Sequence, residues 1–205
     1  MKDFIIRKCM SYVKKNTNYD KQKLIEIKYG LSTLYLVISK FLIISILCIF
    51  LGIFKEMLIF TTIFTILRMP AFGLHATKSW ICLISSAIIF ISLTFLCINI
   101  KLNLFIRIII SLVSIIFILK NAPADTRKKP IVNKSTRKKY KIISTILAVI
   151  FSVGAIYINN LFISNCLVFS LILENLLISP IVYKIFNQPY NNYITYLKNH
   201  PELTQ

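Results

Sequence analysis

Long apolar runs are the feature that most constrains this chain. Crossing a bilayer core about 30 Å thick takes roughly 20 helical residues. Of 205 residues, 57% are hydrophobic and the mean hydropathy is +0.73, more than a soluble domain of this size can bury. The sequence therefore predicts an all-α, polytopic membrane protein, with membrane-spanning segments at 33–54, 79–99, 103–119, 142–158 and 161–185.

A sixth run, residues 57–67, is short for a crossing, so it either spans a thinned bilayer or re-enters it. Lys and Arg accumulate on the cytoplasmic side of short loops. If all six runs cross, the 25 Lys and Arg residues fall on one side, except Lys40, Lys55, Lys101 and Arg107. We therefore expect six transmembrane helices, one of them short, with both termini in the cytoplasm.

The polar segments complete the expected organisation. Residues 1–32 alternate apolar and basic positions, which favours interfacial amphipathic helices over a solvated basic tail and shows no cleavable signal peptide. The expected parts are the interfacial segment 1–32, four spans in 33–119, a basic cytoplasmic loop at 120–141, two spans in 142–186 and a cytoplasmic tail at 187–205. Ser144, Ala148 and Ser152 repeat every four residues and predict a narrow helix face for close packing.

The net charge of +18 raises the question of a polyanionic partner. The basic residues flank apolar spans and form no separate polar domain, so anionic lipid headgroups fit better than nucleic acid. The five cysteines are scattered and odd in number, and we expect reduced thiols without a disulfide framework.

Two residues near the start of the third predicted span could carry chemistry. His75 follows the helix breakers Pro70 and Gly73, and Cys82 falls in the first or second turn of the next helix. The positive end of that helix and a nearby imidazole would favour the nucleophilic thiolate. A continuous helix would separate the pair by about 10.5 Å, so the chain must bend near Gly73 for His75 to reach Cys82.

Other polar residues leave alternatives open. By spacing alone, His75 is as well explained as an interfacial histidine. Asp125 is either a third catalytic residue or a solvated loop acid. Glu174, deep in the last span, is either protonated or paired with Lys40, and it affects substrate passage or assembly if it has a role. The sequence predicts no metal site and, lacking a glycine-rich phosphate loop, no nucleotide cofactor.

Two sequence segments resemble the accessory gene regulator protein B (AgrB) family. One runs from Arg68 to Cys82, and the other reads Asn-Ala-Pro-Ala-Asp-Thr-Arg-Lys-Lys-Pro-Ile over residues 121–131. The resemblance covers almost the whole chain, with both motifs in the expected order. Phe72 departs from it, because the family usually has a second glycine there.

The resemblance implies a membrane cysteine endopeptidase of quorum sensing in the bacterial cell membrane. Such a protein removes the C-terminal part of an AgrD-like precursor peptide and helps to close a cyclic thiolactone. Carried over by position, His75 and Cys82 would be the catalytic pair, and Arg68 and Gly73 would support them. The resemblance also implies a homodimer. The topology expected from the basic residues places the active site on the cytoplasmic side.

The basic loop suggests where a precursor would dock. Its candidate docking residues are Lys128, Lys129, Arg137, Lys138 and Lys139, which could hold acidic residues of an amphipathic peptide at the membrane. The alternative is that these charges set topology alone. A small membrane transporter or peptide exporter without thiol chemistry is the main rival function, and a membrane scaffold is third.

Overall fold

The computed structural model describes residues 2–17, 19–74, 79–126 and 130–199. Within these ranges the regular structure is helical, and an isolated parallel bridge pairs Phe72 with Ala124. The helices are α1 (Lys2–Asn16), α2 (Lys21–Phe50), α3 (Phe54–Ala71), α4 (Ser79–Asn99), α5 (Leu104–Asn121), α6 (Lys134–Tyr157), α7 (Leu161–Ile178), α8 (Pro180–Ile185) and α9 (Asn192–Asn199). The prediction of an all-α membrane protein is confirmed, because α2, α4, α5, α6 and α7 are each long and apolar enough to cross a bilayer.

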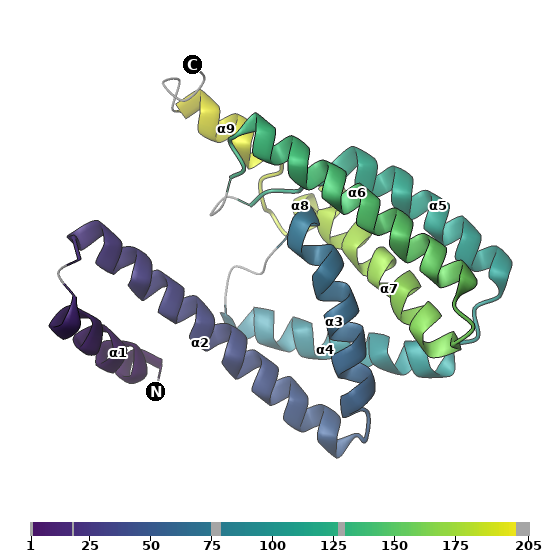
Figure 1. Ribbon diagram of the computed structural model, residues 1–205, viewed down its shortest axis with the longest axis horizontal. Coiled ribbons are helices and arrows are strands. Elements are labelled where there is room, and N and C mark those ends of the chain that lie inside the picture. The colour runs from purple at the N-terminus through teal and green to yellow at the C-terminus, as the bar shows by residue number, and fades with distance from the viewer. Residues whose placement is uncertain (1, 18, 75–78, 127–129, 200–205) are drawn as a thin grey trace. The chain divides into compact units, whose positions relative to one another are not determined.

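The chain divides into two compact units, Met1–Gly52 and Ile53–Gln205. In the first unit, α1 contacts α2 (Figure 1). The sequence suggested one or two short helices before residue 33, but only α1 is separate. No proline stands between Lys21 and Phe50, and Gly30 is accommodated within the helix, so the second half of that segment continues into the span as α2. Gly52, at a φ of +71°, ends this unit in a conformation that glycine adopts without steric cost.

In the second unit, α3 is longer than the predicted run 57–67. Its 18 residues span about 27 Å. Near its start, Phe60 packs in one buried cluster with Cys166 of α7. Just beyond its end, the Leu74 amide donates to the Leu177 carbonyl of α7 at 2.8 Å. The helix therefore packs along α7 from end to end.

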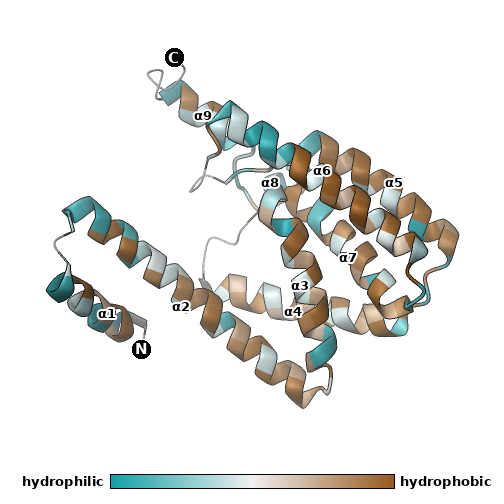
Figure 2. Ribbon diagram, in the orientation of Figure 1, coloured by the Kyte–Doolittle hydropathy of each residue, from teal (hydrophilic) through white to brown (hydrophobic). Residues whose placement is uncertain are grey.

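Helices α5, α6 and α7 lie side by side (Figure 1) and enclose the main apolar core. The predicted small-residue face of α6 is confirmed: Ser144, Ala148 and Ser152 are buried, and Ala148 joins the core. The outward face of α5 stays apolar and exposed, as Leu112 and Val113 show, and Figure 2 shows the same apolar surface along α4. Lipid is the solvent that such a surface requires.

Two predicted boundaries were wrong for local reasons. The run 161–185 is interrupted at Ser179, whose extended conformation follows from the proline after it. The basic loop is also shorter than 120–141. The Asn133 side chain accepts hydrogen bonds from the amides of Ser135 and Thr136 and so begins α6, which makes Arg137, Lys138 and Lys139 helical.

Candidate active site

A sharp turn follows α3 and leads towards His75. Phe72 has φ +61° and ψ −133°, and Gly73 has φ +108°. A side chain in this part of backbone space costs about 1–3 kcal/mol. The Phe72 ring packs edge-on against Tyr140 of α6, with 5.0 Å between ring centroids. The predicted bend at Gly73 is present, and the strained backbone explains why a second glycine suits position 72.

Gly73 is also closely packed. Its amide donates to the Ala124 carbonyl at 2.7 Å. A Cβ at this position would lie 2.7 Å from the Leu177 carbonyl oxygen and would collide with the Arg68 guanidinium. Only glycine therefore fits this turn, for both conformation and space.

The two sequence motifs meet at this turn. Besides the bond from Gly73, the Ala124 amide donates to the Ala71 carbonyl at 3.0 Å, which makes the short parallel bridge between Phe72 and Ala124. The peptide bond between Ala122 and Pro123 is cis. The order of the motifs along the chain is visible in the sequence, but this contact between them is not.

Arg68 connects the turn to α7. Its Nη2 donates to the Leu74 carbonyl at 2.7 Å, and its Nη1 donates to the Phe72 carbonyl. The same Nη1 lies 3.2 Å from Oε1 of Glu174, which is fully buried. From the sequence we expected Glu174 to be either protonated or paired with Lys40. The pairing with Arg68 was not predicted.

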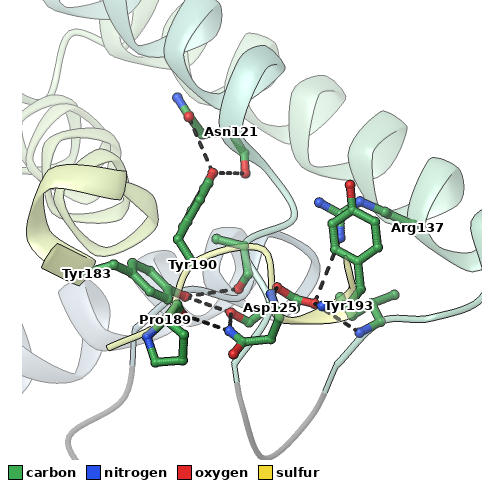
Figure 3. Close-up of polar contacts among 10 residues, drawn as sticks. Asn121, Asp125, Arg137, Tyr183, Pro189, Tyr190 and Tyr193 are labelled. Carbon is green, nitrogen blue, oxygen red and sulfur yellow. Dashed lines mark hydrogen bonds and ion pairs between the residues drawn. The ribbon is translucent and has the colours of Figure 1, made fainter. Parts of the chain in front are cut away.

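Asp125, in the second motif, is buried, so the prediction of a solvated loop acid is wrong (Figure 3). Its Oδ1 accepts a hydrogen bond from the Asn192 amide at 3.0 Å. Its Oδ2 accepts from the Tyr193 amide at 2.8 Å and from the Ile131 amide at 3.4 Å. The carboxylate thus accepts three backbone hydrogen bonds, and these bonds give it a structural role. The sequence alone had left a catalytic role open.

The residues 189–193, here called the C-terminal strap, lie over this motif (Figure 3). The Tyr190 hydroxyl donates to the Asn121 carbonyl at 3.4 Å, and partial burial raises the pKa of Tyr190. Arg137 stacks on the Tyr193 ring at 3.7 Å, and its Nη1 lies 3.9 Å from Oδ2 of Asp125. Sequence reasoning missed the strap, although two tyrosines in a polar tail were a usable signal.

From α8, which precedes the strap, the Tyr183 hydroxyl reaches the same motif. It donates to the carbonyls of Ala124 and Asp125 at 3.3 and 3.1 Å. Tyr183 is almost fully buried. The second motif is therefore held from α8, the strap and α6 together.

The structure describes some of the predicted site residues and not others. Cys82 lies in the first turn of α4, half-buried, where it was expected. Lys138 and Lys139 are exposed on α6, whereas Arg137 is committed to the strap. His75, Lys128 and Lys129 lie outside the described residues. In the parts of the chain that the structure covers, no three His, Cys, Asp or Glu side chains gather as metal ligands.

Comparisons with known proteins agree with the two motifs. Residues 6–178 match the family described as accessory gene regulator B. An AgrB-like protein of Clostridium acetobutylicum is 29% identical over 171 residues, which cover 83% of this chain and 82% of that protein. Accessory gene regulator protein B of Staphylococcus aureus strain Newman is 35% identical over 131 residues, covering 63% and 69%. The protein of that name from the bovine strain RF122 is 27% identical, covering 84% and 91%. No solved structure shows significant similarity.

Replacing Gly73 with alanine should destabilise the fold. The added Cβ meets Leu177 and Arg68, and the positive φ alone costs about 1–3 kcal/mol. Thermal unfolding in detergent measures the loss. Gly30→Ala is the matched control, because that glycine is helical and has no atom within 4 Å of the added Cβ. Equal melting temperatures for the two variants would contradict the close packing at Gly73.

Asp125→Asn should release the C-terminal strap. The asparagine side chain has one acceptor oxygen where the carboxylate has two. One of the backbone N–H groups that the carboxylate binds therefore loses its acceptor, which costs about 1–3 kcal/mol of stability. Limited proteolysis with chymotrypsin should then cut faster at Tyr190 and Tyr193. Asp3→Asn, at an exposed position of α1, should leave the rate unchanged. An unaltered rate in Asp125→Asn would show that the carboxylate does not hold the strap.

Proposed function

Because the chain belongs to the accessory gene regulator B family, and so has its role in quorum sensing, we propose that it is a membrane cysteine endopeptidase. Its substrate is a quorum-sensing precursor peptide, from which it removes the C-terminal part. It then promotes closure of the remaining segment to a cyclic thiolactone. His75 and Cys82 are the catalytic pair of this proposal.

The proposed reaction needs no cofactor. His75 takes the proton of Cys82, and the thiolate attacks the carbonyl carbon of the scissile peptide bond. The C–N bond breaks, the leaving amine takes the proton from His75, and a thioester joins the precursor to Cys82. A cysteine thiol of the precursor then attacks this thioester, forms the ring thiolactone and returns a proton to Cys82. One thioester replaces another, so closure needs no nucleotide.

The contact between the two family motifs is the observation that carries this proposal. Segments about 50 residues apart meet through the backbone bonds between Gly73 and Ala124, directly before His75. The start of α4, with Cys82, follows four residues after Leu74. A catalytic pair needs fixed geometry, and the turn that precedes His75 is held from three directions.

The proposal places the turn at the cytoplasmic face of the membrane. The ends of α3, α5 and α7 that bear the turn, the second motif and Leu177 lie together. The basic first turns of α6 begin at the same end, because Tyr140 contacts Phe72. Lys and Arg mark the cytoplasmic side, where a newly made precursor would arrive.

The rival transporter function rested on six spans and on the buried Glu174. It loses the support of Glu174, because that acid has a partner in Arg68. A buried ion pair between two helices is explained by packing and positioning. A thiol in the first turn of a helix, beside a family motif, is explained by the peptidase.

Substitutions of the pair test the activity. Cys82→Ser removes the thiolate, and His75→Ala removes the base, so each should lower precursor cleavage by a factor of about 10³ or more. Mass analysis after co-expression with a candidate precursor measures the released C-terminal fragment. Cys97→Ser, in the apolar core, is the control for loss of a thiol. Release at the normal rate by either site variant, with normal membrane insertion, would refute the peptidase proposal.

The docking proposal now centres on the exposed lysines of α6. Lys138→Gln with Lys139→Gln should raise the KM for an acidic precursor while kcat changes little, because distant charges bind substrate and transition state alike. Lys55→Gln with Lys101→Gln, in exposed positions outside this region, is the matched control. Equal KM values for both double variants would leave the α6 charges with a role in topology alone.

A further inference from the structure

Glu174 lies in α7, more than 90 residues beyond the first motif and outside the second. We propose that Glu174 is a positioning residue, which acts through Arg68 to fix the turn from Phe72 to Leu74. This inference rests on the proposed function, since the turn leads into His75. It assigns Glu174 a task in the peptidase reaction and none in transport.

The guanidinium of Arg68 contacts the Glu174 carboxylate and two carbonyls of the turn at once. Its Nη1 faces Glu174, with Oε1 at 3.2 Å and Oε2 at 3.5 Å, and also donates to the Phe72 carbonyl. Its Nη2 donates to the Leu74 carbonyl at 2.7 Å. A planar guanidinium has its donors in a fixed fork, so holding one side orients the other. Glu174 thereby sets the direction of the Arg68 N–H groups that donate to the turn.

Burial makes this orientation firm. Glu174 has no exposed surface, and the Arg68 side chain is 14% exposed. An ion pair in such surroundings is poorly screened, and removing one partner leaves a buried charge uncompensated. A guanidinium without Glu174 would turn towards water or lipid headgroups, and the two carbonyls of the turn would lose their donors.

Helix α7 holds the turn at a second point. Leu177 lies three residues after Glu174, on the same face of the helix, and its carbonyl accepts from the Leu74 amide at 2.8 Å. Leu74 is thus bonded through its amide to α7 directly and through its carbonyl to Arg68. Leu74, the last described residue before His75, is therefore held through both its amide and its carbonyl.

Packing and positioning make different demands on the pair. Attraction between α3 and α7 needs one charge of each sign and is satisfied in either order. The carbonyls of Phe72 and Leu74 need donors from position 68, and a glutamate there has none when ionised. Exchanging the two charges therefore separates the two explanations.

The test uses the full-length protein in detergent and the reactivity of Cys82. Its rate of alkylation by iodoacetamide is followed across pH by mass analysis of the Cys82 peptide, so the other four cysteines do not interfere. His75→Ala defines the profile of a thiol without its base. Glu174→Gln keeps the shape of the side chain and removes its charge. In Glu174→Gln we expect the pH profile of Cys82 alkylation to move towards that of His75→Ala. We expect kcat for precursor cleavage to fall by about tenfold to a hundredfold.

The double variant Arg68→Glu with Glu174→Arg is the decisive arm. It should recover the melting temperature relative to either single change, while cleavage and the Cys82 profile stay impaired. Glu56→Gln, at the opposite end of α3, is the control and should match the parent. A parental profile and kcat in Glu174→Gln would overturn the inference, as would full recovery of cleavage in the exchanged pair. If His75→Ala leaves the profile unchanged, the His75–Cys82 proposal fails and takes this inference with it.

Discussion

Arg68 carries its charge to the end of an apolar helix, and Glu174 of α7 balances that charge. Without the balance, α3 would bring a bare cation into the protein interior. With it, α3 lies along α7, and the guanidinium has donors left for the two carbonyls after the helix. The close approach at Gly73 and the contact with Ala124 both follow from this anchoring.

Local signals predicted much of this fold. The apolar runs located α4 and α5 and the end of α6 within about two residues, and the small-residue spacing found the buried face at Ala148. Cys82 falls in the first turn of α4 because helix starts follow short-range rules. The Asn133 cap and Pro180 set the two boundaries that were missed. The break at Ser179 was readable from Pro180 but was hidden by the continuous apolar run around it.

Long-range contacts could not be predicted in this way. Glu174 and Arg68 are 106 positions apart, and nothing in the periodicity of either helix names the other. Asp125 looked solvated because its neighbours in sequence are polar, yet its donors come from residues 192 and 193. Arg137 looked like one of a run of free cations, and only the tertiary structure distinguishes it from Lys138 and Lys139.

The C-terminal strap links the motif at Asp125 to the order in which the chain is made. Residues 192 and 193, which supply two of the three backbone amides that donate to Asp125, are the last part of this site to be made, so the site is incomplete until they dock. A protein that stops after α7 would keep the helices α2 to α7 and both motifs, but Asp125 would lose two of its amide donors and the residues that lie over it. Docking of the strap is thus the step that completes the second motif.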